Sequence, residues 1–155
     1  MNDKRFSQQD GITIFTIGFA KKSAHDFFEI LKKAGVRKLI DIRLNNVSQL
    51  AGFTKKNDLK YFLHEIAGID YVHYPDLAPT KEILDGYKKK TFDWAEYEER
   101  FLKLIAGRNI ENLITRDEAD GACLLCSEST ADRCHRRLVS EYLRNKWGDV
   151  KIRHL

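Results

Sequence analysis

Cysteine and proline are both scarce in this sequence. Its 155 residues include three cysteines and two prolines, and Cys123 and Cys126 form the one pair with Cys-x-x-Cys spacing. A small, odd number of cysteines does not support the disulfide framework of a small secreted protein. This single pair lies within an apolar run, and no second pair follows it, so the familiar zinc pattern of two such pairs is absent. We therefore expect free thiols rather than a cross-linked scaffold.

Long apolar runs are also absent. No stretch approaches the roughly 18 apolar residues of a transmembrane helix, so no membrane partner is expected. The first residues, MNDKRFSQQDGI, lack the apolar stretch of a signal peptide, which predicts a cytoplasmic location. There is no internal repeat, low-complexity tract or Pro/Gly-rich linker. These features predict a single domain over residues 1–155, with residues 1–10 as a flexible N-terminal extension.

The charge balance is only mildly basic. The chain has 27 Lys and Arg residues against 23 Asp and Glu, which gives a formal net charge of +4. That bias is not a nucleic-acid signature by itself, and most of the lysine pairs indicate solvated helix ends and loops. A basic rim that attracts phosphate is the alternative. An anionic small molecule or a nucleic acid is therefore the partner to consider, and the oligomeric state is not predicted.

Short β-branched and aromatic segments alternate with segments of helical periodicity. The apolar run ITIFTIGF at residues 12–19 predicts a buried strand. The other predicted strands are residues 36–43, 71–74, 121–126 and 150–155. Strands that alternate with helices require crossover connections and a mainly parallel sheet. We therefore predict an α/β, three-layer Rossmann-like domain with a mainly parallel sheet of about five strands.

Capping residues predict where the helices begin. Ser23 with Asp26, and Asp93 with Glu96, have the capping-box spacing. Including their caps, the predicted helices are residues 23–35, 57–68, 93–107 and 132–147. Residues 75–90 contain both prolines and are predicted to be irregular and exposed.

Polar and ionisable residues collect where the predicted strands end. Ligands of such sheets bind outside the carboxyl ends of the strands. The residues at these ends are Gly18, Asp41, Arg43, His73, Cys126 and Glu128. A thiol, carboxylates, an imidazole and a guanidinium at one edge predict a pocket that can bind an anion and carry out chemistry on it.

The start of the last helix adds to this pocket. With Asp132 as the cap, Cys134 and His135 fall in the first turn. Unpaired backbone N–H groups and the helix dipole favour negative charge there. A thiol in that turn, beside Arg133 and Arg136, can have a lowered pKa, and an anion can be held by the same groups.

Plainer interpretations of the same residues stay open. Cys126 can be a small buried apolar residue, and Cys134 can be helix packing. Asp41 and Arg43 point the same way on a strand and can form a simple ion pair. Cys123 lies inside a strand and is predicted to be core.

Two further chemistries are weighed against these. Cys126, Cys134 and His135 offer metal ligands, with Glu128 or His73 as a fourth, but C-x7-C-H is not a familiar zinc spacing, so no metal is expected. A Cys126–Cys134 disulfide is geometrically possible but not expected as a structural bond in the cytosol.

Rhodanese-like or phosphatase-like thiol chemistry is a further alternative. The loop from Cys126 to Arg133 is longer than the loops of those enzymes and contains no glycine. The likeness therefore rests on the layout of strand, cysteine and helix, which is an analogy of fold.

Five segments together resemble one known family. They are TIGFAKKSAHDFFEILKKAGV, LIDIR, GF-TK, IDYVHYPDLAPT and LLCSES-x4-CHRRLVSEYL. From about Ile12 to the C-terminus, the chain is similar to the family catalogued as domain of unknown function 488. The resemblance implies an α/β domain without an established reaction.

The sharpest motif of that family is Cys-x-Glu followed by Cys-His-Arg. Here it falls on Cys126, Glu128, Cys134, His135 and Arg136. The Asp-x-Arg element falls on residues 41–43 and Thr-Ile-Gly on residues 16–18. Two loops depart from the usual pattern, with Asn-Val-Ser at residues 46–48 and Leu-Ala-Pro-Thr at residues 77–80. Both flank the expected pocket, so substrate preference can differ from that of other members.

These observations lead to one functional prediction with two alternatives. We predict an enzyme that acts on an anionic, phosphate-bearing nucleotide or nucleic acid. The candidate catalytic residues are Cys126, Glu128, Cys134, His135 and Asp41. The candidate anion-binding residues are Arg43, Arg136, Gly18, Ser48 and His73. The alternatives are a non-catalytic nucleotide or nucleic-acid binding module and rhodanese-like thiol chemistry, and no cofactor is expected.

Overall fold

The computed structural model describes residues 11–47 and 52–155. Its five strands are β1 Ile12–Gly18, β2 Lys38–Asp41, β3 Asp70–His73, β4 Ala122–Cys126 and β5 Val150–His154. All strand pairs are parallel, and the order across the sheet is β3-β2-β4-β1-β5. The predicted parallel sheet is confirmed. The predictions for residues 1–10 and for Ser48 lie outside the described residues.

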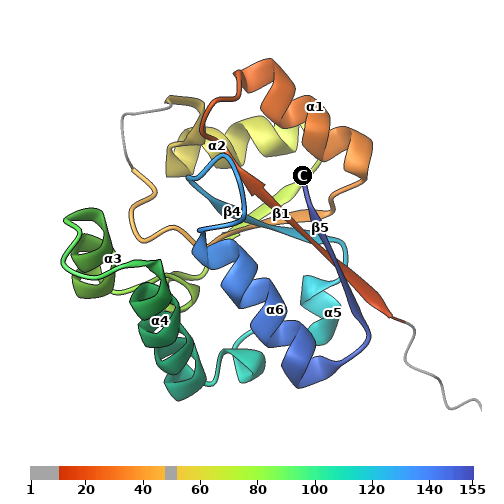
Figure 1. The fold of residues 1–155 in the computed structure, drawn as a ribbon. Coiled ribbons are helices and arrows are strands. Elements are labelled where there is room, and N and C mark those ends of the chain that lie inside the picture. Colours follow the sequence, from red (N-terminus) through yellow and green to blue (C-terminus); the bar gives the residue numbers. More distant parts are fainter. Residues whose placement is uncertain (1–10, 48–51) are drawn as a thin grey trace, which may run out of the picture.

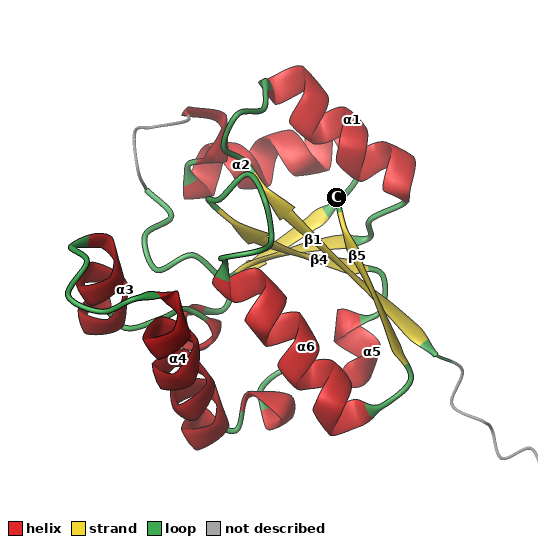
Figure 2. Cartoon of the chain, in the orientation of Figure 1, coloured by secondary structure: helices red, strands yellow, loops and turns green. Residues whose placement is uncertain are grey.

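Helices cover both faces of the sheet, which makes three layers (Figure 1). The longer ones are α1 Ala24–Ala34, α2 Lys56–Phe62, α3 Lys81–Lys88, α4 Trp94–Arg108 and α6 His135–Trp147. Short helical turns lie at Gly52–Thr54, Leu63–Ala67, Pro75–Leu77, Ile110–Asn112 and α5 Arg116–Ala119. Figure 2 shows α1 and α2 on one side of the sheet and α3 to α6 on the other. The predicted α/β, Rossmann-like class is therefore confirmed.

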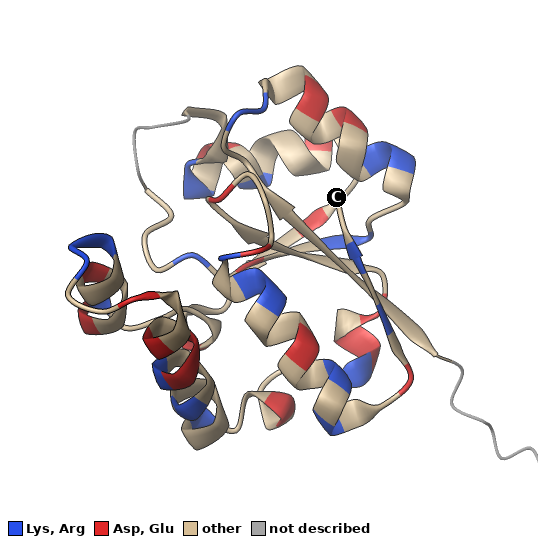
Figure 3. Cartoon of the chain, viewed as in Figure 1, with Lys and Arg blue, Asp and Glu red and all other residues tan. Residues whose placement is uncertain are grey.

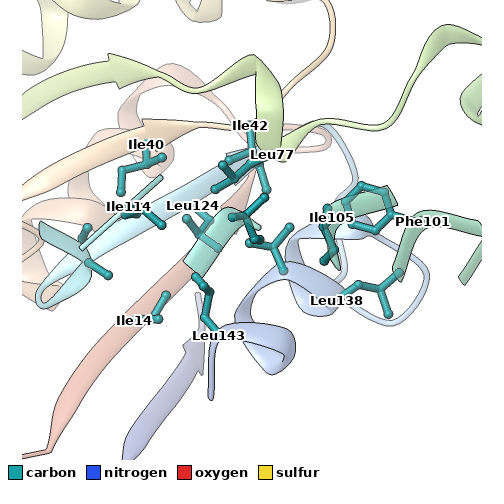
Figure 4. Close-up of a cluster of buried hydrophobic side chains, with 14 of the residues drawn as sticks. Ile14, Ile40, Ile42, Leu77, Phe101, Ile105, Ile114, Leu124, Leu138 and Leu143 are labelled. Atoms are coloured by element: carbon teal, nitrogen blue, oxygen red, sulfur yellow. The ribbon is translucent and has the colours of Figure 1, made fainter. Parts of the chain in front are cut away.

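Alternating strand residues supply two hydrophobic cores. On β1, Ile14 packs against the α4–α6 side and Ile17 against the α1–α2 side. Figure 4 shows the first core, where strand residues meet Phe101 of α4 and Leu138 of α6. Cys123 belongs to the second core, as predicted, and is fully buried. Strands that are apolar on both faces are typical of a sheet buried between two helix layers.

Three local predictions were wrong. Residues 75–90 are not irregular, because Thr80 caps α3 by accepting a hydrogen bond from the backbone N–H of Ile83, which packs into the core. The cap of α2 is Lys55 rather than residue 57. The cap of α6 is Cys134 rather than residue 132, and no side chain caps that helix by a hydrogen bond. The caps of α1 and α4, Ser23 and Asp93, are confirmed.

The connections leave a crevice between β1 and β4. These two strands are neighbours, with Gly18 opposite Cys126 at their carboxyl ends. From there α1 departs over one face of the sheet and α6 over the other (Figure 1). Adjacent strands whose following helices lie on opposite faces form a topological switch point, where ligands of such folds bind. Among the described residues, no helix is long and apolar enough to cross a membrane.

Candidate functional site

A cavity of about 380 Å³ lies at this switch point. Its described lining comes from the ends of β1, β2 and β4, from the start of α6, and from α3 and α4. Five of the predicted site residues line it: Arg43, Cys126, Glu128, Cys134 and His135. The predicted convergence of strand ends on one edge therefore produces a real hollow of the volume that small ligands occupy.

Cys126 is the last residue of β4 and sits at the floor of the cavity. Its exposed fraction is only 1%, yet it contributes to the lining. A guanidinium N–H of Arg136, at Nη1, is directed at the Cys126 sulfur at 3.0 Å. Such a contact stabilises a thiolate more than a neutral thiol, because the guanidinium is a charged donor.

Arg136 is the most unusual charge in the structure. It lies in the first turn of α6, is 1% exposed and forms no ion pair with a carboxylate of the described residues. Its Nη1 also donates to the carbonyl oxygen of Glu128 at 2.6 Å, and its Nε donates to the hydroxyl of Thr16 at 3.2 Å. Burial lowers the pKa of Arg136 because desolvation penalises its charged form.

Within the described part of the chain, that arrangement leaves a buried positive charge without a carboxylate counterion. A charge removed from water costs several kcal/mol unless an opposite charge or several hydrogen bonds compensate it. The nearest groups that can become negative are the sulfurs of Cys126, at 3.0 Å, and Cys134, at 3.8 Å. The electrostatics of the site therefore favour either a thiolate or a bound anion beside Arg136.

Cys126 and Cys134 form a sulfur pair. Their sulfur atoms are joined in the structure, and their Cα atoms are 7.6 Å apart. Ordinary disulfides have Cα separations of about 4.4–6.8 Å. The expectation of free thiols holds for Cys123 among the described residues, whereas Cys126 and Cys134 are paired. The wide backbone separation argues against a cross-link that holds the fold together, and the chemistry considered below concerns the reduced form of this pair.

Asp41 and Arg43 form the second charged unit. Both are buried, and Arg43 donates from Nε and Nη2 to the two oxygens of Asp41 at 2.9 and 2.8 Å. Arg43 also donates to the carbonyl oxygen of Thr54, and Tyr71 donates its hydroxyl to Asp41. Asp41 does not line the cavity, so its contacts fit a positioning role better than a catalytic one. No described residue accepts a hydrogen bond from Nη1 of Arg43, which lines the cavity.

His135 is held in its neutral form. Its Nε2 donates to the carbonyl oxygen of Ile42 at 2.7 Å, and its ring packs edge-on against Phe101. Burial lowers the pKa of His135 to about 4, with a smaller contribution from the charge of Arg136 and an opposing one from the Ile42 hydrogen bond. Since Nε2 carries the proton, Nδ1 keeps a lone pair, and no described residue donates to it.

The rim of the cavity is basic. Among the described lining residues, Arg43, Lys88 and Arg133 are positive and Glu128 alone is negative. Figure 3 shows basic segments in the first turn of α6 and on α3, on two sides of this region. Lys88, Arg133 and Glu128 are exposed, and no hydrogen bond or ion pair holds their side chains among the described residues. These charges are free to meet a ligand.

Gly18 and His73 belong to the site's frame rather than to its lining. A Cβ at Gly18 would overlap the carbonyl oxygen of Glu128 and approach Nη1 of Arg136, so only glycine lets the β4–α6 loop lie this close to β1. The Nε2 atom of His73 lies 2.9 Å from the carbonyl oxygen of Arg43, which fixes the loop after β2. Neither residue is among the lining residues of the cavity.

One wall of the cavity was missed by sequence reasoning. Tyr87 of α3, with Trp94 and Tyr97 of α4, lines the side opposite the strand ends. Trp94 and Tyr97 fall in the predicted helix at residues 93–107, but the sequence did not indicate that they line a cavity, and α3 was not predicted at all. Site residues were sought at the ends of strands, so cavity residues that lie on helices were not found.

The described residues contain no group of three or more His, Cys, Asp and Glu side chains arranged to hold a metal ion. Although Cys126, Cys134 and His135 share the cavity, His135 uses Nε2 for a carbonyl oxygen and the two sulfurs face Arg136. A guanidinium repels a cation from the same space, so the side chains that were considered as ligands do not make a cation site.

A comparison with known protein families matches residues 23–143 to the family described as "Domain of unknown function DUF488". The chain belongs to this family. The matched segment of DUF488 spans β2, β4 and the start of α6, and so includes Asp41, Arg43 and residues 126–136. Gly18 precedes the matched segment, and β5 follows it. Comparisons with curated proteins and with solved structures gave no match.

Proposed function

We propose that this protein is an enzyme in which the thiolate of Cys126 attacks an anionic, phosphate-bearing substrate of the nucleotide or nucleic-acid class. The observation that carries the proposal is the buried Arg136 guanidinium, 3.0 Å from the Cys126 sulfur and without a carboxylate partner among the described residues. An activated cysteine nucleophile commonly has a neighbouring cation in a partly desolvated site.

The reaction class is nucleophilic displacement. The Cys126 sulfur gives an electron pair to the electrophilic atom of the substrate, and the bond to the leaving group breaks. The leaving group takes a proton from solvent water. The carboxylate of Glu128 lines the same cavity and has no ion pair among the described residues, so it is a candidate base for the second step. Water then releases the product from the sulfur, and Glu128 or Nδ1 of His135 accepts the proton from that water.

The anionic group of the substrate has several candidate partners. Arg133 and Lys88 are exposed at the rim and have no ion pair with any residue that the structure describes, and Nη1 of Arg43 is directed away from Asp41. Guanidinium groups bind phosphate through paired hydrogen bonds, whereas an ammonium acts as a point charge. Unlike Cys126, Arg136 is not among the lining residues of the cavity, so its proposed role changes from direct anion binding to stabilising negative charge on the Cys126 sulfur.

The deciding experiment is the alkylation rate of each cysteine against pH. The native, reduced protein is treated with iodoacetamide, and mass spectrometry follows each site. We expect the Cys126 profile to have its midpoint well below about 8.5, the ordinary value for a thiol. Cys123 should stay inert, because it is fully buried and burial raises its pKa. Inorganic phosphate should slow the Cys126 reaction.

Two matched variants make this test specific. Arg136→Met should move the Cys126 midpoint up toward the ordinary thiol value, whereas Arg144→Met, which changes an exposed arginine on the same helix, should leave it unchanged. If all three cysteines stay inert until the wild-type protein unfolds, Cys126 is packing and the proposal is wrong.

A non-catalytic binding module is the second candidate. The near-complete burial of Cys126 favours it, since an attacking sulfur needs access to its target. This candidate predicts that Cys126→Ser leaves ligand binding intact, and that binding weakens steeply as salt rises, because phosphate contacts depend on ionic strength. Rhodanese-like sulfur transfer, in contrast, predicts a persulfide on Cys126 after incubation with thiosulfate.

A further inference from the structure

We infer that the α3–α4 wall of the cavity binds one planar aromatic ring of the substrate, so that the substrate is a single nucleotide or a molecule of the same plan. The inference rests on the proposed function, because the ring and the anionic group would occupy the same cavity. The residues at the strand ends account for recognition of the substrate's charge, and this inference identifies a second part of the substrate that is recognised.

Three rings make up this wall. The ring centroids of Trp94 and Tyr97 are 4.9 Å apart with planes inclined by 19°, and Tyr87 lies 5.6 Å from Trp94 and 5.2 Å from Tyr97. Tyr97 is buried, while Trp94 and Tyr87 are partly exposed and line the cavity. The rings fix one another in place, so a planar ligand meets a surface that does not have to be ordered first.

Aromatic and basic groups meet on this wall. Lys88 directly follows Tyr87 on α3, and Arg133 and Arg43 lie on the other part of the lining. A nucleotide has the complementary plan, with a flat base at one end and a phosphate at the other. Bases stack on aromatic side chains whatever their identity, and the phosphate needs only the cations.

The volume argues for a small ligand. At about 380 Å³, the cavity is near the lower end of the roughly 300–1,000 Å³ typical of small-molecule sites. A bare phosphate would leave the rings of Trp94 and Tyr87 facing water. A single base with its sugar and phosphate covers both the rings and the cations.

The test uses the fluorescence of Trp94. The chain has two tryptophans, so Trp147→Phe leaves Trp94 as the sole tryptophan, whose fluorescence is excited selectively. This protein is titrated with AMP, GMP, CMP and UMP, and with ribose 5-phosphate as the probe that lacks a base. Protection of Cys126 from iodoacetamide is measured with the same probes. We expect at least one nucleotide to quench Trp94 and to protect Cys126 at about a tenfold lower concentration than ribose 5-phosphate.

Two pairs of variants separate ring from charge. With protection of Cys126 as the readout, Trp94→Leu should remove the preference for the nucleotide over ribose 5-phosphate, and Trp94→Phe should keep most of it. Lys88→Gln should weaken both probes, whereas Lys89→Gln, next to it but outside the lining, should weaken neither.

Failure of this inference is distinguishable from failure of the proposed function. If no nucleotide binds better than ribose 5-phosphate while Cys126 reacts as a thiolate, the ring site is wrong and the proposed function stands. Suppose instead that Cys126 is inert, but a nucleotide quenches Trp94 at a lower concentration than ribose 5-phosphate does. The ring site then stands and the catalytic proposal is wrong.

Discussion

Two buried arginines in one small site carry very different electrostatic balances. Arg43 has a bidentate carboxylate partner in Asp41, and Arg136 has none among the described residues. A paired buried charge is sensitive to loss of its partner, because the remaining charge is then uncompensated. An unpaired one already bears that penalty, and a sulfur or a ligand must supply the missing charge. The paired Arg43 therefore fits a structural role, and the unpaired Arg136 fits a role in a reactive site.

Loss of the Asp41 carboxylate should therefore be severe. We expect Asp41→Asn to lower the free energy of unfolding by about 3–5 kcal/mol, because Arg43 then lies buried without a counterion. Urea unfolding would measure this, and Asp70→Asn, at an exposed residue on β3, is the control. Adding Arg43→Met to Asp41→Asn should recover part of the loss. A double variant less stable than the single one would contradict this account of the pair.

At the scale of single elements, the junction of β1, β4 and α6 determines the geometry of the site. The β4–α6 loop crosses close over Gly18, and Arg136 reaches from α6 to the loop carbonyl of Glu128 and to Thr16 of β1. The hydroxyl of Thr16 also lies 2.6 Å from Nδ1 of His154 on β5. The loop, two strands and a helix are thus held together through one arginine side chain.

Gly18→Ala tests how tightly this junction is built. The added methyl group would overlap the Glu128 carbonyl, and we expect a loss of about 1–3 kcal/mol in unfolding free energy, as for an overpacked core. The same change should slow alkylation of Cys126, because the loop that carries Arg136's acceptor must shift. Gly107→Ala is the control: it lies in α4 with nothing near its Cβ, and there alanine should stabilise the helix by about 1 kcal/mol. If Gly18→Ala and Gly107→Ala change the free energy of unfolding equally, the junction is not tightly packed.

The elements that sequence reasoning located are those with local signals. The runs of β-branched residues gave the strands, and the capping patterns at Ser23 and Asp93 gave two helix starts that the structure confirms. The missed helix α3 has only eight residues and includes Gly86, so its periodic signal is short, and its packing through Ile83 comes from tertiary contacts. The last helix starts later than predicted because the chain from residue 127 to 133 forms the cavity loop first.

The site divides in the same way. The rule for strand ends brought Cys126, Glu128 and Arg43 to one edge, and the structure places them in one lining. The rule could not distinguish residues that line the cavity from residues that hold the lining in place. Asp41 and His73 were therefore grouped with the catalytic and binding residues, although neither lines the cavity. That no carboxylate of the described residues pairs with Arg136 could not be predicted from the sequence either, because it depends on which side chains are far away in the folded chain.

At the scale of the whole molecule, the buried imidazole couples stability to pH. The ordinary pKa of histidine is 6.5, and burial lowers that of His135 to about 4. As the pH falls below 6.5, the unfolded chain binds a proton at this residue and the folded protein does not. Stability is therefore lost progressively between pH 6.5 and about pH 4, and below that range both states are protonated and the loss is complete.

This coupling is measurable by comparison with a variant. We expect His135→Gln, whose amide can still donate to the Ile42 carbonyl, to reduce the loss of unfolding free energy between pH 7 and pH 4 by at most about 3 kcal/mol. Partial exposure of the ring makes the actual figure smaller. Parallel slopes for wild type and His135→Gln would show that the imidazole titrates as it does in the unfolded chain.

The position of β4 in the sheet also decides when the molecule can assemble during its synthesis. β4 lies between β1 and β2, which do not pair with each other, but it is the fourth strand along the chain. A nascent chain that has not yet released residue 126 from the ribosome therefore has β2–β3 as one partial sheet and β1 apart from it. Since long-range parallel pairing forms slowly, the emerging chain keeps its apolar strands open until that point. The thiol of Cys126 is therefore synthesised as part of the strand that joins β1 to the β2–β3 pair.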